Sequence, residues 1–220
     1  VIKAVNHLRS NPNHQKSKTT LEKAYPAALQ FFNNRIEISK SSNDEFKWGQ
    51  VVESMESVNT MYEQINRCPE CKKMFPQPQL FTKDLNSARE KAAEETYKAG
   101  VKKLQIATLS SAREAYNLFR MTEHYMPNYK DCDEKIEVAK EMATLKVVLE
   151  NVQLPSAKYG LTADFFFKNV ESFINNDFSK KTFIRLYLPE EAERIALVPH
   201  HIIRIAFDDF VVGNSVMKRD

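Results

Sequence analysis

The stretch that decides the fold is Ser111–Pro127, SAREAYNLFRMTEHYMP. Small and apolar residues recur in it at intervals of three and four, which places them on one helix face: Ala115, Leu118, Phe119, Thr122, Tyr125 and Met126. Ser111 and Glu114 have the spacing of a capping box, so we predict that the helix begins there. Pro127 cannot continue the helix and marks its end. The stretch therefore predicts one amphipathic helix of a larger array.

The same periodicity predicts three further long helices upstream. They cover about 85–105, about 45–66 and a segment within 19–39. Asn43 or Asp44 is a suitable cap for the helix over 45–66, and Thr19 with Glu22 suits the helix within 19–39. Pro26 must lie in the first turn of that helix or kink it. The apolar face of the helix over 45–66 comprises Trp48, Val51, Val52, Met55, Val58, Met61, Tyr62 and Ile65.

The predicted helices recur in pairs. Pro12, Pro69 and Pro127 follow successive apolar helices and are 57 and 58 positions apart. A shift of 64 residues also superposes the apolar face of the helix over 45–66 on that of Ser111–Pro127. The two offsets differ, so the repeat is imperfect. It predicts an antiparallel helix-pair array over residues 1–144.

One pair resembles a tetratricopeptide repeat. The matching residues are Thr96-Tyr-Lys-Ala-Gly100, followed by Ala115, Phe119, Thr122 and Pro127. This resemblance implies two packed helices in which small residues permit close approach. The chain departs from the family in having three extra residues between Gly100 and Ala115 and threonine in place of alanine at Thr122. Arrays of this kind bind peptides or partner helices in a groove. We expect most of the aromatic residues at helical spacing to fill the core and some of them to line such a groove: Tyr25, Phe31, Phe32, Trp48, Tyr62, Tyr97, Tyr116 and Tyr125.

Beyond about residue 145 the pattern changes. Leu145–Val152 suits a strand or the end of a preceding helix, Thr182–Leu188 and His201–Val212 suit strands, and Pro189–Arg194 suits a short helix with proline at its first position. An apolar helix is expected after Thr162, with Phe165, Phe166, Val170, Phe173 and Ile174 inward. We therefore predict a mostly α protein, with a helical-repeat domain at 1–144 and a small α/β or α+β domain at 145–220 that is incomplete at its C-terminus.

Composition narrows the function classes. The 220 residues carry a net charge of +3, and acidic residues are mixed with the basic ones, so we expect no nucleic-acid partner. No apolar run is long enough for a membrane span, and the first residues do not have the charged-then-apolar pattern of a signal peptide. Because the chain begins at Val1 within an amphipathic pattern, we expect it to be a segment or processed form of a longer protein.

Cys68-Pro-Glu-Cys71 is the motif in the chain whose residues most directly suggest metal binding or redox chemistry. It could hold zinc, but a structural site needs four ligands, and Cys132 and His124 are more than fifty residues away. It could exchange disulfides, but redox motifs of this form usually follow a strand, whereas this one follows a predicted helix. We prefer a third interpretation, in which the motif ends one helix and turns the chain toward the next, and the two cysteines are small apolar residues of that turn (the elbow interpretation). With three cysteines, we expect no disulfide scaffold.

The polar candidates in the C-terminal part are equally weak. His200 and His201 are adjacent, so in a strand they point to opposite faces and cannot chelate one ion together. Asp208 and Asp209 interrupt a strand pattern, as a β-bulge does; they could be acid/base groups or metal ligands, but carboxylates at such a position more often mark a solvated kink. Glu190 and Glu191 suit a helix first turn. We predict no catalytic, cofactor-binding or metal-binding residues; the alternatives are an enzyme with a site around His201, Asp208 and Asp209, or a zinc or redox module at Cys68 and Cys71.

The two-part layout also resembles helical-repeat lipoproteins of the Bacteroidetes cell envelope. The residues that match are Ser111–Tyr116, Pro127–Asp131, Val170–Phe173 and Phe207–Gly213. The resemblance implies a non-enzymatic scaffold or subunit of an envelope complex that binds other proteins through its helical surface. It also implies the periplasmic face of the outer membrane, with any lipid anchor outside this segment; the alternative location is cytoplasmic.

Overall fold

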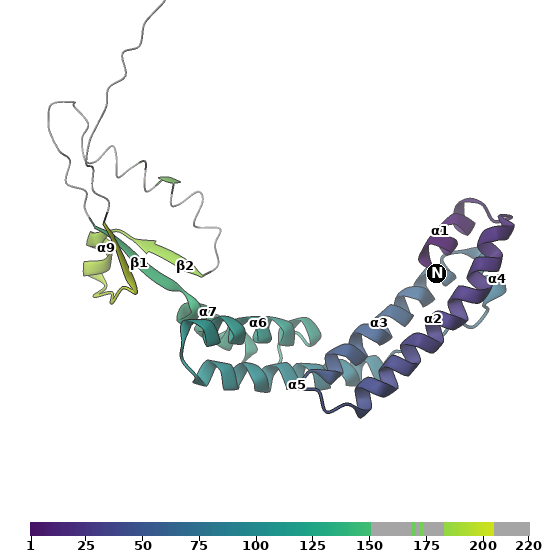
Figure 1. The fold of residues 1–220 in the computed structure, drawn as a ribbon, viewed down its shortest axis with the longest axis horizontal. Coiled ribbons are helices and arrows are strands. Elements are labelled where there is room, and N and C mark those ends of the chain that lie inside the picture. The colour runs from purple at the N-terminus through teal and green to yellow at the C-terminus, as the bar shows by residue number, and fades with distance from the viewer. Residues whose placement is uncertain (151–168, 170–171, 174–182, 205–220) are drawn as a thin grey trace, which may run out of the picture. The chain divides into compact units, whose positions relative to one another are not determined.

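The computed structural model describes residues 1–150, 169, 172–173 and 183–204. Within these residues the protein is mostly helical, with one small sheet (Figure 1). The elements are α1 (Ile2–Ser10), α2 (Gln15–Ser41), α3 (Lys47–Asn66), α4 (Pro69–Met74), α5 (Lys83–Gln105), α6 (Leu109–Tyr125), α7 (Cys132–Ala143), β1 (Leu145–Glu150), β2 (Ile184–Tyr187), α9 (Pro189–Arg194) and β3 (His201–Arg204). They divide into two compact units. The first unit holds Val1–Ile106 and Glu114–Glu137, and the second holds Ala107–Arg113 and Val138–Asp220.

The first unit is built from helices that bury apolar faces on one another. α2 and α3 lie side by side, and α1 and α4 pack at one end of this pair (Figure 1). Two cores run through the unit. The first gathers around Leu8, Leu21 and Ile65, and the second around Val51, Met55 and Ala92. The predicted apolar face of α3 is confirmed, except that Trp48 and Tyr62 are only half-buried.

The helices begin at residues other than those predicted. α2 begins at Gln15, four residues before the predicted cap, because the ring of His14 accepts the backbone N–H of Ser17. Pro26 lies inside α2 rather than in its first turn. The Thr19 hydroxyl bonds back to the Gln15 carbonyl, so the predicted Thr19 cap is wrong.

The predicted caps of α3 and α6 are also wrong. Neither Asn43 nor Asp44 caps α3, which has no cap from its own N-cap side chain. A carboxylate oxygen of Glu95, on α5, instead accepts the backbone N–H of Trp48. α6 begins at Leu109 because the side chains and backbone N–H groups of Thr108 and Ser111 bond reciprocally. The capping box is therefore Thr108–Ser111 rather than the predicted Ser111–Glu114. Prolines do follow α1, α3 and α6, as expected.

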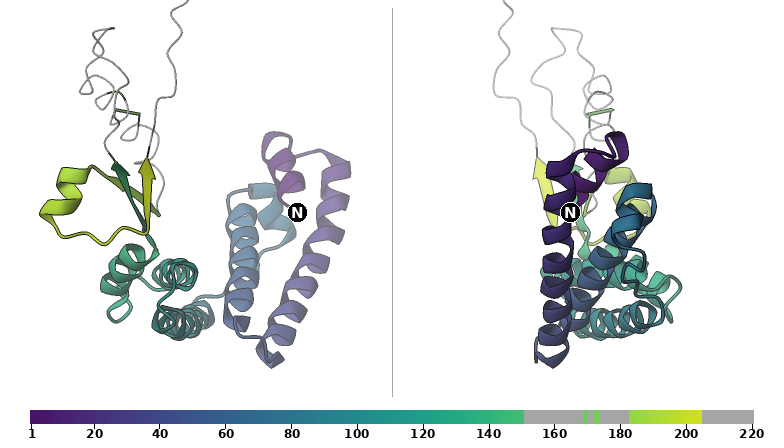
Figure 2. Two further views of the ribbon diagram at one scale, coloured as in Figure 1. Left: turned by 60° about the vertical axis from the view of Figure 1, so that its left-hand side comes forward. Right: turned by 90° about the vertical axis from the view of Figure 1, so that its right-hand side faces the viewer.

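The second unit contains a three-stranded parallel sheet in the order β2-β1-β3. Leu145 is in register with Ile184, and Val147 with His201. Figure 2 shows β1 and β3 side by side and running in the same direction. α9 has the predicted bounds and buries Ala192 against Val148 and Tyr187. Both apolar residues of β3, Ile202 and Ile203, are exposed. The predicted helix after Thr162 lies outside the described residues except for Asn169, Ser172 and Phe173, which are helical; Phe173, predicted to point inward, is exposed. The strand predicted beyond Arg204 lies outside the described residues.

Candidate functional site

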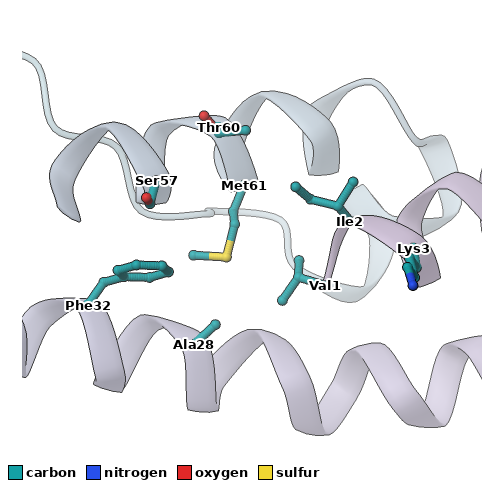
Figure 3. A pocket seen from close by; sticks show the side chains of 8 residues that line it. All are labelled: Val1, Ile2, Lys3, Ala28, Phe32, Ser57, Thr60 and Met61. Carbon is teal, nitrogen blue, oxygen red and sulfur yellow. The ribbon is translucent and has the colours of Figure 1, made fainter. Parts of the chain in front are cut away.

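The first unit carries an open groove between α1, α2 and α3 (Figure 3). Its volume is about 520 Å³. Met61 lies at its centre, with Phe32 on one side and Val1 on the other. The lining residues are Val1, Ile2 and Lys3 from the start of the chain, Ala28 and Phe32 from α2, and Ser57, Thr60 and Met61 from α3. The residues that line the groove lie at the edge of each helix's apolar face, where that face meets the surface.

The groove offers apolar surface rather than reactive groups. The hydroxyls of Ser57 and Thr60 each donate to the carbonyl four residues earlier in α3, at 2.8 and 2.9 Å. Their hydrogens are therefore already engaged. Lys3 is the single charged side chain among the lining residues. An apolar site with this composition suits side chains of another polypeptide.

A second hollow, of about 690 Å³, lies where the loop after α4 meets α2. The Tyr25 hydroxyl accepts the Gln79 backbone N–H at 3.2 Å, and the Tyr25 and Phe75 rings are 4.6 Å apart. Burial raises the pKa of Tyr25 above its ordinary value. Of the aromatic residues predicted to line a groove, Phe32 and Tyr25 therefore line hollows.

The motif at Cys68 and Cys71 forms a disulfide at the junction of α3 and α4. The two Cα atoms are 5.1 Å apart, and both residues are fully buried in the first core. Cys68 Sγ also accepts the Cys71 backbone N–H, and Pro69 occupies the first position of α4. Within the described residues, no three His, Cys, Asp or Glu side chains are grouped to hold a metal ion. Since redox-active cysteines are partly exposed, this burial favours the elbow interpretation.

Cys132, the third cysteine, is far from a reactive state. It is buried and donates its thiol hydrogen to the Phe119 carbonyl at 3.2 Å. Burial is the main cause that raises its pKa to about 11, with neighbouring acidic groups adding to the effect. The thiol is consequently protonated at neutral pH.

α5 and α6 contact each other at several positions within the first unit. Thr96 and Thr122 hydroxyls are 2.8 Å apart in the core. Gly100 lies against the ring of Phe119: a Cβ atom at Gly100 would come within 2.8 Å of Phe119 Cε1. Near the end of α5, Lys103 pairs with Glu114. Glu114 is thus engaged by Lys103 rather than in the predicted capping box.

A polar and aromatic cluster follows α6. The Tyr97 hydroxyl donates to a carboxylate oxygen of Asp131, and this bond is the first cause that raises the pKa of Tyr97 to about 12. The same bond lowers the pKa of Asp131, and Lys135 contributes to that shift. Lys130 lies over the rings of both Tyr97 and Tyr129. The cluster ties the end of the α6–α7 loop to α5.

Among the residues of the second unit that the structure describes, the predicted polar candidates are not brought together. Lys146 donates its backbone N–H to His200 Nδ1 and accepts the His200 backbone N–H, so His200 extends the β1–β3 pairing. His201 is exposed in β3. Glu190 and Glu191 lie in the first turn of α9, and Glu191 pairs with the exposed Arg185. Asp208 and Asp209 lie outside the described residues.

Sequence reasoning missed the groove between α1, α2 and α3. Apart from Lys3, its residues are apolar or small, and they come from positions 1–3, 28–32 and 57–61, so no local motif marks it. The one available signal was the prediction that aromatic residues of the array line a groove, which Phe32 satisfies.

Comparison of the chain with protein-family models, with curated proteins and with solved structures finds no match. Among the helices that the structure describes, none is both long and apolar enough to cross a membrane.

Proposed function

We propose that the protein is a non-enzymatic scaffold, a subunit of a bacterial cell-envelope complex that binds other proteins through its helical unit. The observation that carries this proposal is the groove between α1, α2 and α3, whose lining is apolar and contains no acid/base pair. Its occupant would be a partner polypeptide that inserts apolar side chains beside Met61 and Phe32. This mode of binding needs no cofactor.

The contacts of α5 with α6 support a tetratricopeptide-like, antiparallel array. Moving along α5 from Thr96 to Gly100 to Lys103, the partners on α6 are Thr122, Phe119 and Glu114. The partner number falls as the residue number rises, which is the order expected for antiparallel helices. Small residues at the crossing let the two helices approach, as the family pattern requires.

The disulfide supports a location in the cell envelope. Disulfides persist in oxidising compartments such as the periplasm, whereas the cytosol keeps thiols reduced. A Cys68–Cys71 bond buried in a core is therefore easier to reconcile with the periplasmic face of the outer membrane than with the cytoplasmic alternative. A lipid anchor would lie outside this segment.

The experiment that tests the proposal fills the groove without touching the core. Thr60→Arg places a long cation at the rim, and Thr19→Arg is the matched control, because both threonines are exposed and bond to the carbonyl four residues earlier. Proteins that co-purify with the chain from its source cells are quantified by mass spectrometry for the three forms. We expect a defined partner to be lost with Thr60→Arg and retained with Thr19→Arg.

The opposite results are equally clear. If no partner co-purifies, or if Thr60→Arg retains every partner of the unaltered chain, the groove is not the binding surface. Equal thermal unfolding midpoints of both variants serve as the control for folding.

A further inference from the structure

α2 has a second apolar face that points away from the cores of the first unit. Phe31 is 59% exposed and Ile38 is 71% exposed. Small residues continue the line that these two define, and all but one are exposed. The outer seam, as we name it, comprises Thr20, Ala24, Ala27, Phe31, Asn34 and Ile38; Ala24 is half-buried.

The spacing of the outer seam is that of a helix-docking surface. The intervals between its members are 4, 3, 4, 3 and 4 residues, the heptad pattern of a and d positions in a coiled coil. The core stripe of α2, which includes Leu21, Tyr25 and Ile36, lies on another side of the helix and is already buried. Pro26 falls at a c position, off the seam. A heptad seam fits a second helix better than it fits an extended strand.

We propose that the outer seam binds the same seam of a second copy, forming an antiparallel α2–α2 pair with two-fold symmetry. Such an interface is isologous, so every contact away from the two-fold axis occurs twice. In one antiparallel register, each a residue of one copy faces a d residue of the other. The residue numbers of the two members then have the same sum in every facing pair. Phe31 then faces the partner's Ala27, and Ile38 faces the partner's Thr20. The two large residues of each copy are thus accommodated by two small ones.

The charges that flank the seam select the same register. Lys23, Gln30 and Glu37 occupy the g positions beside it, and all three are exposed. In antiparallel pairs, g positions face g positions. The register that places Phe31 opposite Ala27 also places Lys23 opposite the partner's Glu37 and Gln30 opposite the partner's Gln30.

The facing charges cannot pair within one chain. Lys23 and Glu37 are separated by 14 residues, or roughly 21 Å along the helix. Glu37 pairs with Lys40 in the single chain, at an exposed site that a neighbouring copy can share. The size match and the charge match arise from different residues, yet they agree on one occupant and one register.

The seam is also partly organised before docking. The Phe31 ring lies edge-on to Phe32, with centroids 5.2 Å apart, so its position is constrained in the single chain. Because each copy contributes only two large apolar side chains, we expect micromolar rather than nanomolar affinity.

The first test measures the mass of the full chain by sedimentation over roughly 1 to 300 μM. Phe31→Glu should weaken the dimer about 100-fold, since it removes a buried aromatic from two symmetric contacts and places two charges there. Met121→Glu is the matched control, because Met121 is a similarly large exposed residue on a helix, at 41% exposure, outside the seam. It should leave the dimer unchanged.

The second test reads the register. Lys23→Glu alone places a second carboxylate opposite the partner's Glu37, and Glu37→Lys alone places lysine opposite lysine; each should weaken self-association about tenfold. An equimolar mixture of the two variants should recover the original affinity to within about twofold, because both facing pairs are again opposite in charge. Glu22→Lys, on an exposed position off the seam, controls for altered net charge.

Three results would overturn the proposal: a monomer at every concentration, a dimer that Phe31→Glu leaves intact, or a mixture that associates no better than its components. Thr60 belongs to α3 rather than to the seam helix α2, so Thr60→Arg should not alter the dimer. Loss of partners with an intact dimer, or the reverse, therefore distinguishes the two proposals.

Discussion

Replacing Gly100 by alanine tests whether α5 and α6 approach as closely as the structure indicates. The added Cβ would lie 2.8 Å from Phe119 Cε1 and 3.0 Å from two further ring atoms. The Phe119 ring is fully buried and packs edge-on to Tyr97, so it has no free space to enter. Overpacking of this kind costs about 1–3 kcal/mol. Three ring atoms lie within 3.0 Å of the new Cβ, so the cost lies in the upper part of that range, about 2–3 kcal/mol. Alanine regains up to about 1 kcal/mol through helix propensity, so we expect a net loss of about 1–2 kcal/mol in the free energy of unfolding.

Gly49→Ala is the matched control. A Cβ at Gly49 would approach the Tyr125 hydroxyl oxygen at 2.7 Å, but this atom is the far end of a half-buried side chain that can swing outward. The clash is thus relieved cheaply and the helix propensity gain remains. We expect a change within about 0.5 kcal/mol of zero, or a small gain.

Urea unfolding followed by circular dichroism measures both variants, and the slope of the transition must be unchanged for the comparison to hold. Combining Gly100→Ala with Phe119→Leu should cost less than the sum of the single changes, since the smaller side chain vacates the space that the new methyl group needs. A neutral or stabilising Gly100→Ala would show that the two helices do not meet at Gly100. The support for a tetratricopeptide-like pair would then be lost.

Three other predictions concern single groups. Cys132, with its pKa raised to about 11, should react with a thiol reagent at pH 8 at least about 100-fold more slowly in the folded chain than in urea; equal rates would contradict its burial. Asp131 has a lowered pKa because the Tyr97 hydroxyl bonds to it, so this contribution is present above the ordinary carboxyl pKa and is lost as pH falls through the lowered one. Asp131→Asn should therefore destabilise the chain at pH 7 by less than about 1 kcal/mol, and by nothing near pH 2, in urea titrations. His200→Ala removes the acceptor of the Lys146 N–H, so hydrogen exchange at Lys146 should accelerate, with a loss of about 0.5–1.5 kcal/mol; unchanged exchange would show that the bond is not formed.

Sequence periodicity predicted the elements whose determinants are local. α9 has its predicted bounds because Pro189 fixes the first helical position and acidic residues follow it. The caps of α3 and α6 could not be predicted in the same way. The acceptor for Trp48 is Glu95, 47 residues further along, and becomes available only when α5 packs against α3. For α6, the spacings Thr108–Ser111 and Ser111–Glu114 both suit a capping box; the structure forms the first, while Glu114 pairs with Lys103 of α5.

The state of the cysteine pair also could not be predicted from local sequence. Spacing identified Cys68 and Cys71 as the pair most suited to metal binding or redox chemistry, and Pro69 correctly marked a helix boundary. Whether the thiols hold a metal, exchange electrons or form a bond depends on what surrounds them. The structure surrounds them with the apolar core of α1, α2 and α3, and this burial is what distinguishes a structural bond from a reactive one.

α2 explains why the proposed binding surfaces were harder to predict than the fold. Its apolar residues form two stripes, one through Leu21, Tyr25 and Ile36 and one through Phe31 and Ile38. Either stripe alone satisfies helical periodicity, and together they weaken the contrast from which an inward face is inferred. Only the packing of α3 decides which stripe becomes core. The stripe that packing leaves outside is then the informative one, because exposed apolar residues at regular spacing cost solubility unless another helix covers them.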